Sequence, residues 1–306
     1  MKKIIIFTVL LIFIPFFIVT IFDIDEVEEI KLKYINNVTI RVKRLATNEV
    51  ETIALEEYIT GVLAGEMPIY FELEALKAQA VASRSYALKR IEYNKDNDYD
   101  VVDSVLNQVY LDDEYLKTAW GSNYTKNINK LRTAVNETID EYLEYDGEVI
   151  DALFFSTSNG YTENSNLVFN LDLPYLKSVE SIWDKDTSSV FNSSTSMSLQ
   201  EFYEKLGLEY NEKLNIEILS KSDTNRILKL KVNDVELTGR FMYEKLGLRS
   251  TDFEIIQNGS NVEIKTKGYG HGVGMSQYGA QGMALSGFSY TKILAHYYTD
   301  TKINKI

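Results

Sequence analysis

The N-terminal segment constrains this chain most, because it contains a long run without any charged side chain. Residues 4–22 are nineteen consecutive uncharged residues, and about 20 apolar residues form a helix that spans a bilayer. Lys2 and Lys3 precede the run, and acidic residues follow it directly. Basic residues stay on the cytoplasmic side, so residues 1–26 are predicted to be a single-pass anchor and short spacer, with the remaining chain outside. A cleaved signal peptide is the alternative, but its apolar region is shorter, about 7 to 15 residues, and ends in small residues.

The residue types that are missing exclude several kinds of chemistry. The chain has no cysteine and only two histidines, His271 and His296. Neither a thiol nucleophile nor a His/Cys zinc set can therefore be assembled, because zinc sites need several nitrogen or sulfur ligands. A formal net charge of −13 repels nucleic acid. The expected partner is a small molecule, a glycan or a protein.

Periodic patterns predict a mixture of helices and strands. Residues 38–42 alternate like a strand, residues 55–64 and 72–92 have helical spacing, and Pro68 ends the first of these helices. Residues 184–196 are rich in Ser and Asp without a clear period, and are expected to form a linker or surface loop. The pattern further predicts a mostly helical stretch over 110–142, strands at 148–155, 215–219, 226–232 and 262–267, and a helix over 291–298.

Glu66 stands at the end of a predicted helix, between Gly65 and Met67. Apolar neighbours and the negative end of the helix dipole would both raise the pKa of its carboxyl group. A carboxylic acid with a raised pKa can protonate a glycosidic oxygen at neutral pH. The alternative is a solvated surface glutamate, because the chain has 45 acidic residues.

Two further groups of residues are candidates for ligand contact. The segment GYGHGVGMSQYGAQG at 268–282 displays His271, Ser276 and Gln277 beside six glycines, which allow close approach of a ligand to the backbone. It does not match GxGxxG, and a tight turn packed in the core is the alternative. On the helix over 72–92, Lys77 and Arg84 share one face, where they could meet one anion, whereas Gln79 points about 200° away from Lys77. A solvated charged face is the alternative there.

The predicted architecture is an α+β fold of two lobes outside the anchor. A helical lobe over 27–183 carries Glu66, and a strand-rich lobe over 184–306 carries the glycine-rich loop, residues 268–282. Ligand sites favour such junctions, so the substrate cleft is expected between the lobes.

Four segments resemble the stage II sporulation protein D family of membrane-anchored lytic transglycosylases. They are LEEYITGVLAGEMPIYFELEALKAQAVASRSYALKR at 55–90, FFSTSNGYTENS at 154–165, LTGRFMYEKLGLRSTDFEI at 237–255, and GYGHGVGMSQYGAQGMALSGFSYTKILAHYYT at 268–299. The resemblance implies that Glu66 is the catalytic residue and that Lys77, Gln79 and Arg84 are polar residues near the site. The substrate-binding residues expected from these segments are Lys77, Gln79, Arg84, Ser156, Glu163, His271, Ser276, Gln277 and Tyr278.

The resemblance also implies a reaction and a setting. The reaction cleaves the bond between N-acetylmuramic acid and N-acetylglucosamine in peptidoglycan and closes a 1,6-anhydro ring, with Glu66 as acid and then as base. Relatives act on strands stripped of stem peptides, in a complex with a sporulation amidase and a multi-span membrane protein, at the mother-cell membrane facing the forespore during engulfment. Stripping exposes a lactyl carboxylate, which Lys77 or Arg84 is hypothesised to bind. Some relatives bind zinc through His and Cys near the STSNG loop, residues 156–160. This chain has Phe155, Ser158 and Tyr161 there, so no metal or other cofactor is expected.

Two other functions compete with this interpretation. A muramidase-type hydrolase would need a second carboxylate, such as Glu163, roughly 5 to 9.5 Å from Glu66. A non-catalytic wall-binding or scaffolding protein would use Glu66 and the glycine-rich loop only to hold a glycan.

Overall fold

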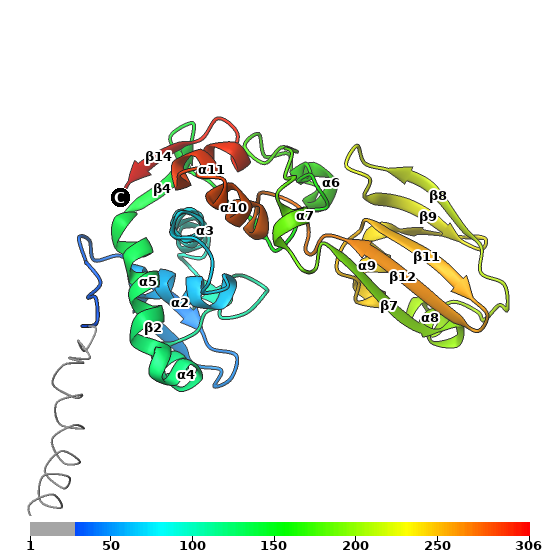
Figure 1. The fold of residues 1–306 in the computed structure, drawn as a ribbon, viewed down its shortest axis with the longest axis horizontal. Coiled ribbons are helices and arrows are strands. Elements are labelled where there is room, and N and C mark those ends of the chain that lie inside the picture. The colour runs from blue at the N-terminus through cyan, green and yellow to red at the C-terminus, as the bar shows by residue number, and fades with distance from the viewer. Residues whose placement is uncertain (1–27) are drawn as a thin grey trace, which may run out of the picture.

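The computed structural model describes residues 28–306, which form two lobes side by side (Figure 1). The core of the larger lobe contains buried residues between Ile40 and Leu176 and again between Val273 and Tyr298. The core of the smaller lobe is built from residues between Met197 and Ile264. The smaller lobe is therefore an insertion into the larger one.

This grouping of the cores differs from the predicted division at residue 184. The prediction assigns the glycine-rich loop and the C-terminal helix to the strand-rich lobe, whereas Val273, Met275 and Leu294 belong to the core of the larger lobe. The chain returns to the larger lobe because its C-terminal helices bury their apolar faces against a helix far earlier in the sequence. Local periodicity does not reveal that partner.

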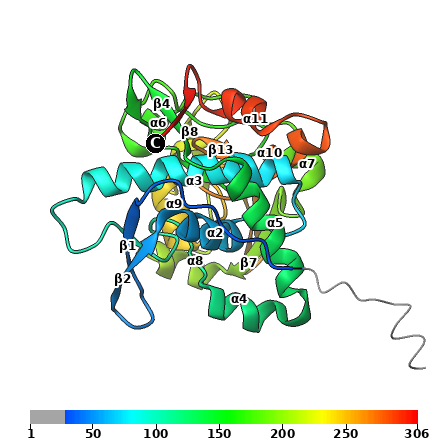
Figure 2. The ribbon, with the colours of Figure 1, turned by 90° about the vertical axis from the view of Figure 1, so that its left-hand side faces the viewer.

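The larger lobe is organised around one central helix, α3. Its helices are α2 (Leu55–Glu66), α3 (Leu73–Tyr93), α4 (Asp113–Trp120), η1 (Gly121–Asn123), α5 (Tyr124–Glu137), α6 (Ser165–Phe169), α7 (Asp184–Thr187), α10 (Gln277–Leu285) and α11 (Tyr290–Tyr297). Figure 2 shows α3 lengthwise among its neighbours, and it contacts α2, α5, α10 and α11. Many alanines keep α3 slim and strongly helical, so these helices pack closely around it.

Small sheets complete the larger lobe. One has the strand order β2-β1-β3 and another the order β14-β4-β5, while β13 pairs in parallel with β6. The strands are β1 (Thr39–Lys43), β2 (Val50–Ala54), β3 (Val101–Val102), β4 (Glu141–Tyr145), β5 (Glu148–Val149), β6 (Phe154–Phe155), β13 (Met275–Ser276) and β14 (Lys302–Lys305). The β6–β13 pair matters for the site, because it joins the end of the glycine-rich loop to the segment that begins at Phe154.

The smaller lobe contains two three-stranded antiparallel sheets and two helices. The sheets have the orders β10-β9-β8 and β11-β12-β7. The elements are β7 (Asn192–Ser198), α8 (Leu199–Leu206), β8 (Ile216–Lys221), β9 (Ile227–Val232), β10 (Val235–Thr238), α9 (Gly239–Leu246), β11 (Phe253–Asn258) and β12 (Asn261–Lys267). The linker or surface loop predicted over 184–196 is only partly present: residues 188–191 join the lobes without a helix or strand, whereas the flanking residues form α7 and most of β7. Pairing with β12, seventy residues later, creates this strand.

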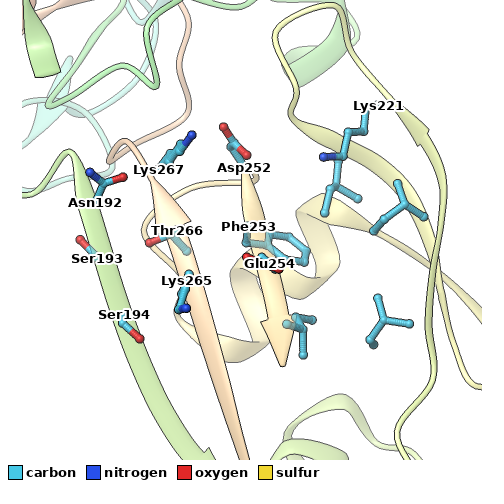
Figure 3. Close-up of a pocket in the computed structure, with 14 residues that line it drawn as sticks. Asn192, Ser193, Ser194, Lys221, Asp252, Phe253, Glu254, Lys265, Thr266 and Lys267 are labelled. Atoms are coloured by element: carbon cyan, nitrogen blue, oxygen red, sulfur yellow. The ribbon is translucent and has the colours of Figure 1, made fainter. Parts of the chain in front are cut away.

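A groove of 840 Å³ opens between the two sheets of the smaller lobe (Figure 3). Its lining mixes apolar side chains such as Phe253 with Lys221, Lys265 and Glu254. None of the predicted site residues lies in it. The predicted anchor, residues 4–22, lies outside the described residues, and no helix within 28–306 is long and apolar enough to cross a membrane.

Candidate active site

Two glycines of α2 bring a loop against the end of that helix. A Cβ atom on Gly61 would lie 2.5 Å from the carbonyl oxygen of Leu111, and one on Gly65 would lie 2.5 Å from that of Val109. Residues four apart share one helix face. The pair therefore makes a smooth strip along which the 109–111 segment packs, and this brings the Val109 amide to the side chain of Glu66.

Glu66 is the last residue of α2, and its half-buried carboxyl group is held by neutral donors. The amide of Val109 donates to Oε1 at 2.7 Å, and Nε2 of Gln277 donates to Oε2 at 3.4 Å. Burial raises the pKa of Glu66, and these two hydrogen bonds only partly oppose the rise. No cation is among the causes of the shift. The carboxyl group therefore holds its proton more tightly than an ordinary glutamate does, and one of its oxygens is only weakly engaged.

Gln277 reaches Glu66 because the start of α10 is fixed in place. Strand β13 pairs with β6, and Ser276 Oγ caps α10 by accepting from the amide of Gly279 at 3.2 Å. Gln277 is the first residue of the helix and is 6% exposed. Of the predicted site residues, the structure therefore joins Gln277 directly to Glu66, with Ser276 positioning it.

Asp184 fixes the position of Ser276, the cap of α10, and the sequence did not predict this role. Its buried carboxylate accepts hydrogen bonds from the amide of Ser158 at 2.7 Å and from the hydroxyls of Ser181 and Ser276. Burial raises the pKa of Asp184, and the hydrogen bonds from Ser181, Ser276 and Ser158 oppose the rise. Asp184 thus ties the STSNG loop to the cap of α10. A Ser- and Asp-rich stretch gave no periodic signal that could have pointed to it.

Tyr278 lies beside Gln277 and packs on the turn that follows Glu66. Its ring meets Phe71 edge to face, with centroids 5.0 Å apart, and its hydroxyl is 3.4 Å from that of Tyr70. Burial and, to a smaller extent, the hydrogen bond with Tyr70 raise the pKa of Tyr278 to about 12. This phenol is therefore neutral at physiological pH. Tyr70 also was absent from the predicted site, because it belongs to no polar pattern.

Lys77, Gln79 and Arg84 lie on α3 but already have protein partners. Lys77 forms ion pairs with Glu74 and Glu137 at 2.7 and 2.5 Å. Gln79 is fully buried, and its Nε2 donates to Ser83. The sequence left two interpretations of these α3 residues open, a ligand site and a solvated charged face. The structure supports neither, because the surrounding elements cover them.

Arg84 is a structural residue in this fold. It is 0% exposed, and its Nε and Nη2 donate to the two carboxylate oxygens of Glu56 at 2.8 and 2.6 Å. Its Nη1 donates to the carbonyl of Glu141. The hypothesis that Arg84 binds a lactyl carboxylate is corrected by this geometry, because Glu56 occupies the fork that a substrate carboxylate would need.

Ser156 and His271 support the loops of the site. The Ser156 carbonyl accepts from the amide of Tyr278 at 3.0 Å. The His271 ring packs between Phe155 and Phe169, with Nε2 bonded to the Phe154 carbonyl and Nδ1 accepting from the Val273 amide. Burial lowers the pKa of His271 to about 4. A neutral imidazole with both nitrogens bonded to the backbone helps to pack this turn. The core-turn interpretation fits residues 272–274, which are buried, but not Tyr269, which is 45% exposed.

Glu163 lies at the junction of the lobes and is fully engaged by the protein. Its carboxylate accepts from the Asn164 amide and the Thr224 hydroxyl, and Arg226 Nη1 is 3.9 Å away. A cavity of 360 Å³ between the lobes is lined by Glu163, Arg226 and His271, but not by Glu66. The cavity at the junction and the candidate acid are therefore separate features.

The donor set around the STSNG loop does not fit zinc. Phe155 has no metal-binding atom, and its ring packs on His271. Ser158 Oγ donates to the carbonyl of Ser181, and the Tyr161 hydroxyl faces Glu180 at 3.4 Å. Among residues 28–306, no three His, Asp or Glu side chains are grouped as metal ligands would be.

Comparisons with known proteins agree on one family. A family model described as "Stage II sporulation protein" matches residues 43–145, which include Glu66 and all of α3. Stage II sporulation protein D of Bacillus amyloliquefaciens is 43% identical over 273 residues, covering 88% of this chain and 79% of that protein. Its namesake in Bacillus subtilis (strain 168) is 41% identical over the same shares.

A more distant relative carries another name. The amidase enhancer of Bacillus subtilis (strain 168) is 29% identical over 80% of this chain and 40% of its own length. The two stage II proteins are similar to this chain over most of their length, and the region that the family model matches contains Glu66. The chain therefore belongs to the stage II sporulation protein D family.

Proposed function

We propose that this chain is a peptidoglycan lytic transglycosylase with Glu66 as its acid and base. The observation that carries the proposal is the environment of this carboxyl group: burial raises its pKa, no cation opposes the rise, and Gln277 engages Oε2 at only 3.4 Å. A raised pKa lets this carboxyl group keep its proton to a higher pH than an ordinary glutamate does, which favours a role as general acid. Membership of the stage II sporulation protein D family supports a role in sporulation.

The two oxygens of Glu66 suit different tasks. Oε1 accepts the short hydrogen bond from the Val109 amide, so the proton belongs on Oε2. As acid, Oε2–H protonates the oxygen that links muramic acid to the next N-acetylglucosamine, and the bond from C1 to that oxygen breaks. As base, Oε2 then takes the proton from the C6 hydroxyl of the muramic acid, while the oxygen of that hydroxyl forms a bond to C1. A 1,6-anhydro ring forms, no water is consumed, and Glu66 regains its proton.

Hydrolysis would need a second, available carboxylate to activate water. Glu163, the predicted candidate, is 1% exposed and has hydrogen-bond partners on both oxygens. This favours the lyase over the muramidase-type hydrolase. It is consistent with a one-carboxyl mechanism, in which the sugar supplies its own nucleophile.

The proposed setting follows from the sequence and the relatives. We infer a single-pass anchor over residues 1–26 with the two lobes outside the mother-cell membrane, facing the forespore during engulfment. The relative named an amidase enhancer supports action beside an amidase that strips stem peptides, in a complex with a multi-span membrane protein. The substrate is then the peptide-free glycan strand.

The test is mass spectrometry of peptide-free glycan strands after incubation with the full chain in detergent and with its Glu66→Ala variant. Anhydro-muramic ends from the wild type alone are the expected result. Products heavier by one water would make the protein a hydrolase. Strands left intact by both forms would contradict catalysis and favour a glycan-binding or scaffolding role.

A further inference from the structure

Tyr70 is an aromatic side chain held in solvent beside the candidate acid. It lies in the short turn between α2, which ends at Glu66, and α3, and it is 65% exposed. Its neighbour Phe71 is fully buried. The turn therefore presents one aromatic ring to solvent and anchors itself in the core through the next one.

The turn that carries Tyr70 is rigid. Lys130 on α5 donates to the carbonyl of Ile69 at 2.9 Å, and the amide of Glu72 donates to Gln281 on α10 at 2.7 Å. The amide of Phe71 donates to the carbonyl of Pro68. The turn is therefore fixed from both sides, and a ligand that used Tyr70 would spend little free energy on ordering it.

The ring of Tyr70 is oriented by other aromatic rings. It meets Phe71 edge to face with centroids 5.3 Å apart, and Phe71 meets Tyr278 in the same way at 5.0 Å. The hydroxyls of Tyr70 and Tyr278 are 3.4 Å apart. Gln277, the residue before Tyr278, donates to Glu66, and Tyr70 follows Glu66 closely in the sequence. The tyrosine pair therefore stands on the two segments that meet at the carboxyl group.

Two of the other exposed tyrosines have a cation over the ring face. Tyr93 lies beneath Lys89 and Arg90, and Tyr269 lies beneath Arg249. Among residues 28–306, the ring of Tyr70 meets that of Phe71, and no cation lies over its face. Its face is therefore available for an apolar surface from outside the protein.

We propose that Tyr70 forms a saccharide-stacking subsite next to Glu66, on which one pyranose ring of the glycan strand lies. The face of a pyranose carries C–H groups, which pack well on the electron-rich face of an aromatic ring. The inference rests on the proposed function for the identity of the glycan. It requires no charge on the ligand, in keeping with an exposed Tyr70 ring that is positioned by the buried Phe71 and by Tyr278.

The test measures binding separately from cleavage. Soluble peptide-free glycan strands are titrated calorimetrically into the full chain in detergent, in a Glu66→Gln background that prevents turnover. Tyr70→Ala is expected to raise Kd about tenfold, and Tyr70→Phe to leave it within about twofold. The matched control is Tyr210→Ala in the smaller lobe, because Tyr210 is 51% exposed and also meets a buried aromatic neighbour, Tyr203. Its Kd should stay within about twofold of the parent value.

Several outcomes would overturn the subsite. An unchanged Kd for Tyr70→Ala, or no binding by the Glu66→Gln parent, removes it. Equal losses in Tyr70→Ala and Tyr70→Phe would assign the effect to the hydroxyl and contradict stacking, and an equal loss in Tyr210→Ala would make it unspecific. Tyr70-dependent binding by a wild type that cleaves nothing would support the subsite and refute the proposed lyase.

Discussion

Glu66 and Asp184 are two acidic residues of the larger lobe with opposite degrees of engagement. Burial raises the pKa of both, and no cation contributes to either shift. Asp184 is 0% exposed and accepts from one amide and two hydroxyls. Glu66 is half-buried and has one short hydrogen bond and one long one.

The difference shows that a perturbed pKa does not by itself identify a catalytic acid. The protein fills the bonding capacity of Asp184, so that carboxylate fastens two loops together. Glu66 retains an oxygen that a substrate atom can approach. Available bonding capacity next to solvent, more than the pKa shift, distinguishes a reacting group from a structural one.

The largest expected effect comes from Glu66→Gln, which keeps the shape of the side chain and removes its acid function. Glycan cleavage should fall about 10³-fold, because the amide of a glutamine cannot supply the proton that the leaving oxygen takes. Anhydro ends are counted by mass spectrometry. Glu57→Gln, an exposed position on the same helix, is the matched control and should retain full activity. Equal losses in both variants would erase the distinction drawn for Glu66.

Asp184→Ala should lower the free energy of unfolding by about 2–4 kcal/mol, because it leaves buried donors on Ser158, Ser181 and Ser276 without an acceptor. Urea unfolding measures the loss. Asp186→Ala, exposed on the same short helix, should change stability by less than about 0.5 kcal/mol. A stable Asp184→Ala protein that has lost cleavage would instead make Asp184 a reacting group.

The third prediction concerns pH and stability. The folded-state pKa of Glu66 is raised, so the folded protein holds this proton more tightly than the unfolded chain does. Its contribution is present at low pH and is lost as the pH rises from the unfolded pKa through the folded one. The stability of the wild type relative to Glu66→Gln should therefore decrease as the pH rises above about 4, the ordinary pKa of a glutamate. Urea unfolding at several pH values measures this, and an increase over that range would show that the pKa is lowered.

The smallest effect is expected from Gln277→Ala. Gln277 donates to Glu66 and thereby lowers its pKa, so its loss should move the alkaline limb of the pH–kcat profile to higher pH. The kcat maximum should fall by less than about tenfold. Gln281→Ala, on the same helix, loses a hydrogen bond to Glu72 instead and should leave the limb in place. A shift to lower pH in Gln277→Ala would reverse the assigned role of its hydrogen bond.

Much of the secondary structure could be predicted from local patterns. The helix predicted over 72–92 is α3, Leu73–Tyr93, and the strand predicted over 226–232 is β9, Ile227–Val232. The predicted strand over 148–155 is only partly present, because two-residue strands, β5 and β6, form at its ends and the residues between them form no strand. Both outcomes follow from length, because a long alanine-rich run suits one structure, whereas a short apolar run depends on which strand lies beside it.

The candidate site was only partly predictable. Glu66 and Gln277, both among the predicted site residues, are 211 residues apart in sequence and come together in the fold. Lys77 and Arg84 do share a helix, but the helix is enclosed, so their charges meet Glu74, Glu137 and Glu56. The Val109 amide, which holds Oε1 of Glu66, carried no signal, because a backbone group is the same at every position.

The sequence by itself determined the family, the long helix α3, the break at Pro68 and the position of Glu66 at a helix end, because these depend on neighbouring residues. Only the tertiary structure decided that the C-terminal segment returns to the larger lobe, that Arg84 is buried against Glu56, and that Asp184 is a hub. Burial and hydrogen bonding depend on residues brought together from distant parts of the chain. A local pattern specifies which side chains a segment offers, and packing decides which of them remain free to react.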